Sequence, residues 1–322
     1  MQPIVWDGKP ITQPGVYAKV DMEAYHGRLV ADDEESASRS FLWTLFNDSP
    51  AHAQLKHYSN EDREDSTETE SEALLLGRAA HHMILGEAHF SESFVFHPET
   101  YPEGATYPSM IGAQKPWNWN ANWCKAWGRD QKGREILRPR HMDSIRGMAN
   151  GLYANPLVRA GILNGLIETT MVARDPRTGI WLKIRPDGIP TDSGDFSDLK
   201  TAADVSDEGI EKAIGETGIF LQGAMTRRVC NMLGIEFTSF SPVFVLKKAP
   251  FCARVKTLTD GDLDLGDKVL DASLELYKRC LDRGVWPGPG GEQTDAEYAQ
   301  MSVWKRKRIE DQLALIEKDS RL

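Results

Sequence analysis

The sequence has no apolar run approaching the roughly 18 residues that a membrane span requires. Its beginning, MQPIVWDGKPITQPG, also lacks the apolar core of a signal peptide. Hydrophobic residues make up 40% and charged residues 27% of the 322 positions, which is typical of globular proteins in water. We therefore expect a cytoplasmic protein that has no membrane partner.

Cysteine is scarce and widely spaced. The four cysteines are Cys124, Cys230, Cys252 and Cys280, and no two of them form a CxxC pair. This spacing argues against a zinc ribbon and provides no disulfide framework. We expect free thiols that are mostly buried.

Positive charge is in deficit, with a formal net charge of −10. This balance argues against a protein that coats nucleic acid non-specifically, but it permits an enzyme with its basic groups in one groove. Part of the excess is local, because residues 57–72 hold seven acids and one arginine, a composition typical of a mobile loop. The basic run KRKR at 305–308 is either the solvated start of a helix or a tail for nucleic acid or a partner.

Turn signals and apolar periodicity divide the chain into helices, then strands, then helices. After an irregular arm over 1–30, helices are expected at 36–55, with an interruption near Ser49-Pro50, at 72–86 and at 138–155. Strands are expected at 167–173 and 179–188, paired as an antiparallel hairpin, and at 195–201, 237–249 and 252–259. Further helices are expected at 205–233, 263–283 and 302–319.

This order predicts an α/β (α+β) fold, with a mixed central sheet flanked by helices and a helical N-terminal elaboration. We expect a single domain over 1–322. It comprises an arm, a helix and the acidic loop (1–70), a core (71–290) and a C-terminal helix (291–322).

Four tryptophans fall within eleven positions, at Trp117, Trp119, Trp123 and Trp127. They either clamp a long loop onto the body or provide stacking surfaces for nucleotide bases. We favour the clamp.

The segment RPDGIPTDSGDFSDLKT (185–201) carries the chemistry. In a strand Asp198 and Lys200 share one face, and Asp187 at the end of the preceding strand can lie beside Asp198. Two adjacent carboxylates repel unless a cation joins them, and oxygen-rich sites suit Mg²⁺ or Mn²⁺. A lysine there can orient the attacking water and offset phosphoryl charge. The alternative is a charged surface hairpin.

Other residues add to this pattern. His81 falls in the apolar stripe of helix 72–86, as a satisfied core histidine or as a ligand, and Gly77 one turn earlier permits close approach of another element. Glu168 is either a further acid of the site or a partner for Arg185. Gln222 lies in an apolar run and needs a partner.

Taken together, the ordered segments resemble the PD-(D/E)XK nuclease superfamily. More narrowly, they are similar to the exonuclease VIII (RecE-type) domains of phage and prophage recombination systems, relatives of the RecB nuclease domain and lambda exonuclease. The resemblance covers most of the chain and rests on PGVYAKVDMEAYHG, SASRSFLWTLFNDSPAHA, LLLGRAAHHMILGEAHF, the hairpin with RPDG, DFSDLKTAADVS, PVFVLKKAPFCARV and WPGPG.

The resemblance implies roles for individual residues. Asp187, Asp198 and Lys200 would be catalytic, and the metal ligands would be His81, Asp187, Asp198 and the backbone carbonyl of Leu199, with Glu168 as a further candidate. Substrate contacts would come from Gln222, Arg185, Arg227 and Arg228. Gln222 matches a Q-x-x-x-Y element in which Thr226 replaces the tyrosine. The cysteine spacing does not fit the iron–sulfur cluster of some relatives, so none is expected.

The implied function is a Mg²⁺-dependent deoxyribonuclease, with Mn²⁺ as a possible substitute, acting as a 5′→3′ exonuclease on ends of linear double-stranded DNA. Its 3′ tails would serve a single-strand annealing protein in phage-type recombination, and the enzyme would form a homo-oligomeric ring. The alternatives are an endonuclease or single-strand-specific nuclease of the same fold, or a non-catalytic DNA-end-binding protein.

Overall fold

The computed structural model describes residues 2–58, 60, 72–86, 90–167, 169–291 and 295–319. The chain divides into two compact units, Met1–Trp286 and Pro287–Leu322. The second unit contains one helix, α12 (Val303–Asp319), among its described residues, and all the sheets lie in the first.

One sheet of the first unit has five strands in the order β1-β2-β8-β9-β3. Its centre is the predicted antiparallel hairpin of β8 (Thr169–Arg174) and β9 (Trp181–Ile184), with Arg174 opposite Trp181. The strand β3 (Ser36–Ser38) runs parallel to β9 on one side. On the other side lie β2 (Gly15–Ala18) and β1 (Ile4–Val5), so the arm expected to be irregular instead extends the sheet.

A second sheet of three strands holds the segment DFSDLKT. The strand β10 (Asp195–Ala202) pairs in parallel with β11 (Ser239–Leu246), which pairs antiparallel with β12 (Ala253–Val255). An isolated bridge between Gly188 and Ser197 connects the end of the hairpin to β10. This bridge brings the segment after β9 beside the first half of β10.

The N-terminal helices follow the predicted interruption. The helix α2 (Arg39–Asn47) ends before α3 (Pro50–Leu55), and the Ser49 hydroxyl accepts a hydrogen bond from the backbone N–H of His52. Proline is tolerated in the first turn of α3, because its missing N–H would have no partner inside the helix. A short helix, α1 (Met22–His26), precedes them, and α4 (Glu72–Leu85) follows.

The prediction of one helix over 205–233 was wrong. Gly218 has a left-handed φ of 69° and separates α9 (Asp207–Glu216) from α10 (Ile219–Leu233). A Cβ atom at this position would lie 2.7 Å from the ring of Trp43. Both the backbone angle and the lack of space therefore favour glycine.

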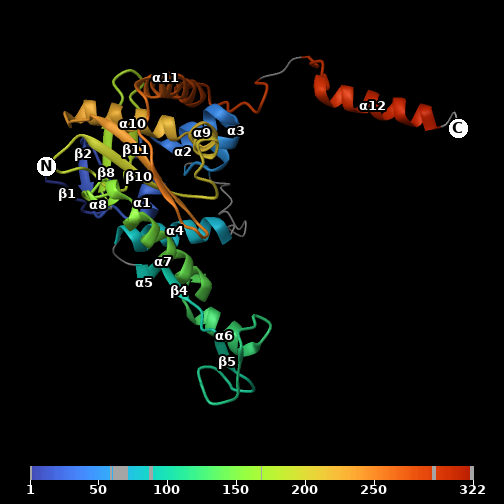
Figure 1. Ribbon diagram of the computed structural model, residues 1–322. Helices are drawn as coiled ribbons and strands as arrows, with labels where there is room; N and C mark the ends of the chain where they lie inside the picture. Colours follow the sequence, from blue (N-terminus) through green and yellow to red (C-terminus); the bar gives the residue numbers. More distant parts are fainter. Residues whose placement is uncertain are drawn as a thin grey trace. The chain divides into compact units, whose positions relative to one another are not determined.

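The sheet of β10 and β11 lies between two helical layers (Figure 1). On one side, Phe196 and Phe244 belong to a core shared with α10 and α11 (Asp260–Arg283). On the other side, Leu199 and Val243 belong to a core shared with α4 and α7 (Pro139–Ala154). Polar residues on β10 therefore face the protein interior and need partners there.

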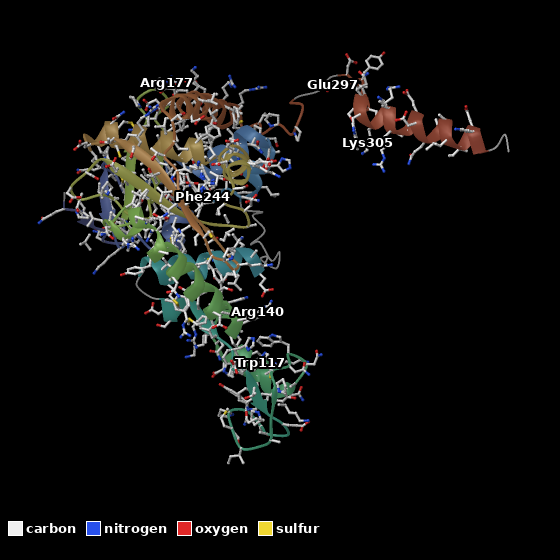
Figure 2. All side chains as sticks on the ribbon, viewed as in Figure 1. Trp117, Arg140, Arg177, Phe244, Glu297 and Lys305 are labelled. Atoms are coloured by element: carbon white, nitrogen blue, oxygen red, sulfur yellow. The ribbon has the colours of Figure 1, made fainter. Side chains whose placement is uncertain are left out.

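An extension between α4 and α7 contains the tryptophans (Figures 1 and 2). Its elements are α5 (Phe90–Ser93), α6 (Asn122–Asp130), the parallel pair β4 (Phe94–Phe96) and β7 (Glu135–Leu137), and the antiparallel pair β5 (Thr100–Pro102) and β6 (Gln114–Pro116). The Trp117 ring contacts Trp119, Trp123 and Trp127 edge-on and stacks on His97. The tryptophans thus form the local core of the extension itself, whereas the clamp interpretation placed them against the body of the protein.

The helix α8 (Pro156–Arg159) completes the first unit. All four cysteines are free, and Cys252 alone among them is exposed. Within the described ranges, no helix combines the length and the apolar character that a membrane crossing demands.

Candidate active site

Asp198 and Lys200 share the face of β10 that looks toward α10, as the strand alternation predicted. Asp198 is buried, at 2% exposure, and its carboxylate forms an ion pair with the Lys200 ammonium group. Gln222 of α10 donates a hydrogen bond from Nε2 to Asp198 Oδ1 over 2.6 Å. The other carboxylate oxygen, Oδ2, is buried beside Lys200 but has no hydrogen bond of good geometry.

Asp187 follows β9 and reaches the middle of β10. Its Oδ2 accepts a hydrogen bond from the backbone N–H of Leu199 and lies 2.9 Å from His81 Nε2. Burial, with the nearby negative charge of Asp198, raises the pKa of Asp187 despite the opposing effects of His81 and Lys200. The two carboxylates therefore share one electrostatic environment, although Asp187 follows β9 and Asp198 lies in β10.

The helix α4 supplies His81 because Gly77 lets it approach β10. A Cβ atom at Gly77 would lie only 2.9 Å from the Thr201 hydroxyl oxygen, so a side chain there would require Thr201 to shift. One turn later, His81 Nε2 lies 3.2 Å from the carbonyl oxygen of Leu199. The structure thus brings together His81, Asp187 and the Leu199 carbonyl, as expected from the sequence.

A cleft of about 700 Å³ opens over this cluster. His81, Asp187 and Lys200 line it, together with the cationic side chains of Arg185 and Lys247 and with Arg78, which pairs with Glu135. A smaller pocket of about 150 Å³ shares Tyr25, Arg185 and Pro186 with the cleft. Its remaining lining is polar for the most part and includes Ser38, Arg39, Ser40, Lys183, Gln222 and Thr226.

Sequence reasoning missed Arg39. Its Nη1 donates a hydrogen bond to the Thr217 carbonyl over 2.9 Å. Burial lowers the pKa of Arg39, while the negative charge of Asp198 favours its cationic form. The available signal was an arginine between two serines at the start of α2, where Ser38 caps the helix.

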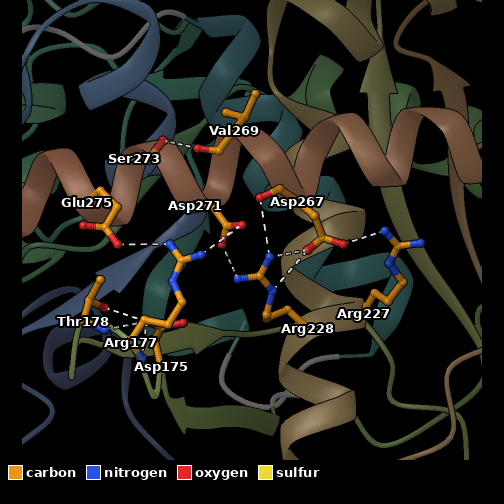
Figure 3. A network of polar contacts seen from close by, with 10 residues as sticks. All are labelled: Asp175, Arg177, Thr178, Arg227, Arg228, Asp267, Val269, Asp271, Ser273 and Glu275. Carbon is orange, nitrogen blue, oxygen red and sulfur yellow. Dashed lines mark hydrogen bonds and ion pairs between the residues drawn. The ribbon is translucent and has the colours of Figure 1, made fainter.

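The prediction of substrate contacts from Arg227 and Arg228 is not supported. Figure 3 shows both guanidinium groups directed toward α11, where Arg227 binds Asp267 and Arg228 binds Asp267 and Asp271. Arg227 also pairs with Asp264. These aspartates satisfy both arginines, so the two arginines join α10 to α11 instead of facing the cleft.

The remaining predicted residues lie at or near the cleft. Arg185 donates from Nη1 to the Val20 carbonyl over 2.7 Å and lines both the cleft and the smaller pocket. Gln222 lines the smaller pocket, and its amide oxygen is buried without a hydrogen-bond partner. Glu168 lies outside the described residues.

The donor set fits a hard divalent cation. It comprises the carboxylates of Asp187 and Asp198, the imidazole of His81 and the carbonyl of Leu199, all of them oxygen or nitrogen donors, and Asp198 Oδ2 is paired with the Lys200 ammonium group. Among the described residues, no three His, Cys, Asp or Glu side chains gather closely enough to hold a metal. Asp198 is turned toward Lys200 and Gln222, whereas Asp187 faces His81.

Comparison with known proteins agrees with the fold. Residues 38–299 match the model of a family described as a PDDEXK-like domain of unknown function (DUF3799). A crystal structure from Eubacterium rectale, named "Putative exonuclease", is similar in fold, with a TM-score of 0.54 and 14% sequence identity, over 89% of this chain and 97% of that one. No curated protein matches significantly.

Proposed function

The chain belongs to the family of PDDEXK-like domains, and from this premise we propose that it is a metal-dependent deoxyribonuclease acting at ends of linear double-stranded DNA. The observation that carries the proposal is the presence of two neighbouring pairs, Asp187 with His81 and Asp198 with Lys200, at a cleft that His81, Asp187 and Lys200 line. The alternative of a charged surface hairpin does not fit, because Asp198 is almost completely buried.

His81, Asp187, Asp198 and the Leu199 carbonyl would hold Mg²⁺ or Mn²⁺. When bound, the cation would supply Lewis-acid stabilisation of the phosphoryl charge. Lys200 would orient the attacking water and offset charge on a phosphate oxygen. Gln222 would keep Asp198 in place through its Nε2 hydrogen bond.

The smaller pocket supports recognition of a strand end. Ser38, Ser40 and Arg39 offer hydroxyl and guanidinium donors beside Gln222 in a volume suited to one phosphate group. A phosphorylated 5′ end carries this group, whereas a 3′-hydroxyl end lacks it. Internal phosphates and single strands carry the same group, so the choice of a 5′→3′ exonuclease over an endonuclease or a single-strand-specific enzyme rests on the resemblance to RecE-type domains.

The wider biological setting rests on the resemblance to RecE-type domains. We propose a phage-type recombination role in the bacterial cytoplasm, in which the 3′ tails pass to a single-strand annealing protein. A homo-oligomeric ring around DNA would reconcile the net charge of −10 with a basic channel.

The test compares linear and circular duplex DNA incubated with the purified protein, with Mg²⁺, with Mn²⁺ or with EDTA. We expect loss of the linear form alone, abolition by EDTA, and a fall of about 10²-fold or more for Lys200→Ala. Lys212→Ala, a surface lysine paired within α9, serves as the matched control.

Nicking of circles would instead identify an endonuclease, and failure to cleave any DNA would leave the non-catalytic end-binding protein. Labelled ends determine the polarity. If the smaller pocket binds a terminal phosphate, removal of the 5′ phosphate and Arg39→Ala should each slow digestion, and their effects should not multiply.

A further inference from the structure

The helix α12 carries a concentrated positive charge. Lys305, Arg306, Lys307 and Arg308 follow one another near its start, and Figure 2 shows Lys305 projecting from the helix. Every side chain described from Val303 to Lys318 is exposed. These four cations therefore remain accessible, in a chain whose net charge is −10.

The position of these cations is unfavourable for the helix itself. The first turn of α12 contains no acidic residue but includes Lys305 and Arg306, although the helix dipole favours acids there by about 0.3–1 kcal/mol each. Glu310 and Asp311 lie one turn beyond Arg306 and Lys307, yet the described side chains form no ion pair with the four cations. Arg227 and Arg228, by contrast, are fully engaged by aspartates.

Trp304 adds a second feature. It is 71% exposed, and the Arg308 guanidinium carbon lies 5.9 Å from the centroid of its ring. This cation–π contact holds the guanidinium near the helix surface without neutralising its charge. The side of α12 with Trp304, Lys305 and Arg308 thus presents preorganised cations to an anion.

We propose that α12 binds the phosphate backbone of duplex DNA, outside the catalytic cleft and without reading sequence. The choice of DNA as the polyanion rests on the proposed nuclease function. Residues 287–302, which begin with PGPGG, lie between the first unit and α12, so the helix acts as a tethered second contact. Such a contact raises the effective concentration of DNA at the catalytic unit.

The experiment measures duplex binding by fluorescence anisotropy over a range of salt concentrations, with EDTA present so that no cleavage is needed. Each phosphate neutralised contributes about −0.9 to the slope of log Kobs against log salt. In the full chain, the combined variant Lys305→Gln, Arg306→Gln, Lys307→Gln and Arg308→Gln should lower the steepness of this slope by about 3 to 4. Glutamine keeps a similar helix propensity.

The control replaces four other lysines by glutamine, giving the same change in net charge: Lys9, Lys132, Lys212 and Lys278. It should keep the wild-type slope. An unchanged slope in the α12 variant, or equal flattening in the control, would overturn the proposal.

Light scattering on the same samples tests a different occupant, since Ile309, Leu313 and Ile316 form an exposed apolar stripe. If the α12 variant differs from the wild type in molecular mass but has the same slope of log Kobs against log salt, α12 binds a second copy of the chain. That result would also overturn the proposal. Because binding is measured without metal, a lack of nuclease activity does not affect this result.

Discussion

At the residue scale, Asp198 shows how a buried carboxylate is accommodated beside a cleft. Lys200 and Gln222 approach it from β10 and α10, and both contacts depend on the strand alternation that turns Asp198 and Lys200 to one face. One oxygen nevertheless lacks a hydrogen bond. That oxygen, Oδ2, is paired with the Lys200 ammonium group instead, so the burial of this carboxylate depends on both of its neighbours.

His57 is a second buried titratable residue, and it has no part in the proposed chemistry. It packs against Phe41 and Tyr58, and its Nε2 lies 3.1 Å from the Tyr277 hydroxyl. Burial lowers the pKa of His57 to about 4, from an ordinary value of 6.5. The folded protein therefore keeps this imidazole neutral in mildly acidic solution.

This shift predicts a loss of stability in acid. Below pH 6.5 the imidazole of His57 is protonated in the unfolded chain, whereas in the folded chain it stays neutral down to about pH 4. The free energy of unfolding therefore falls as the pH falls through this window. Between pH 7 and pH 5 the fall from His57 is about 2 kcal/mol. His57→Phe, which cannot titrate, should lose about 2 kcal/mol less than wild type over the same interval.

Urea unfolding at the two pH values measures the difference, and His52→Phe, at a histidine nearby in sequence on α3, controls for the loss of an imidazole. Equal losses in wild type and His57→Phe would contradict the prediction.

At the element scale, sequence predicted what is local. The β8–β9 hairpin and β10 followed from alternating side chains and turn residues, and α4 followed from its apolar stripe. The break at Gly218 was missed because the apolar pattern continues across it, while the Trp43 ring that requires glycine comes from α2.

The partners of charged residues were less predictable. Arg227 and Arg228 looked available for phosphate because Asp264, Asp267 and Asp271 lie far along the chain, on α11. His81 was correctly placed near Asp187 only because its segment resembles a known family motif. Spacing alone left open whether it was a core residue or a ligand.

Close packing of α7 gives a prediction at this scale. A Cβ atom at Gly151 would lie 1.8 Å from the backbone oxygen of Phe251, in the connection between β11 and β12. Gly151→Ala should therefore destabilise the protein by about 2 kcal/mol, because the clash outweighs the better helix propensity of alanine.

The matched control is Gly215→Ala in α9, where an added Cβ meets nothing within 4 Å. It should stabilise by about 0.5 kcal/mol, because alanine restricts the unfolded chain. Chemical denaturation of both variants measures the two effects, and a stabilised Gly151→Ala would show that the β11–β12 connection does not pack on α7 as described.

At the scale of the whole molecule, the boundary after Trp286 separates the apolar core from a polar helix. The core clusters that include β8–β11, α10 and α11 draw all their buried members from the first unit, and none of the residues described after Trp286 is buried. Apolar burial is the main favourable term in folding, so the stability of the first unit should not depend on residues 287–322.

A chain ending at Trp286 tests this independence. It should unfold at the same denaturant concentration and with the same m value as the full chain, because the m value scales with the surface exposed on unfolding and α12 exposes its surface already. With Mg²⁺, the shortened chain should still digest short linear duplexes at low salt, since the cleft residues all precede Trp286. Its activity should fall more steeply than that of the full chain as salt increases, because the tethered phosphate contact is lost. A lower midpoint of unfolding would show that residues 287–322 pack on the first unit, and the separation of the two units would then be wrong.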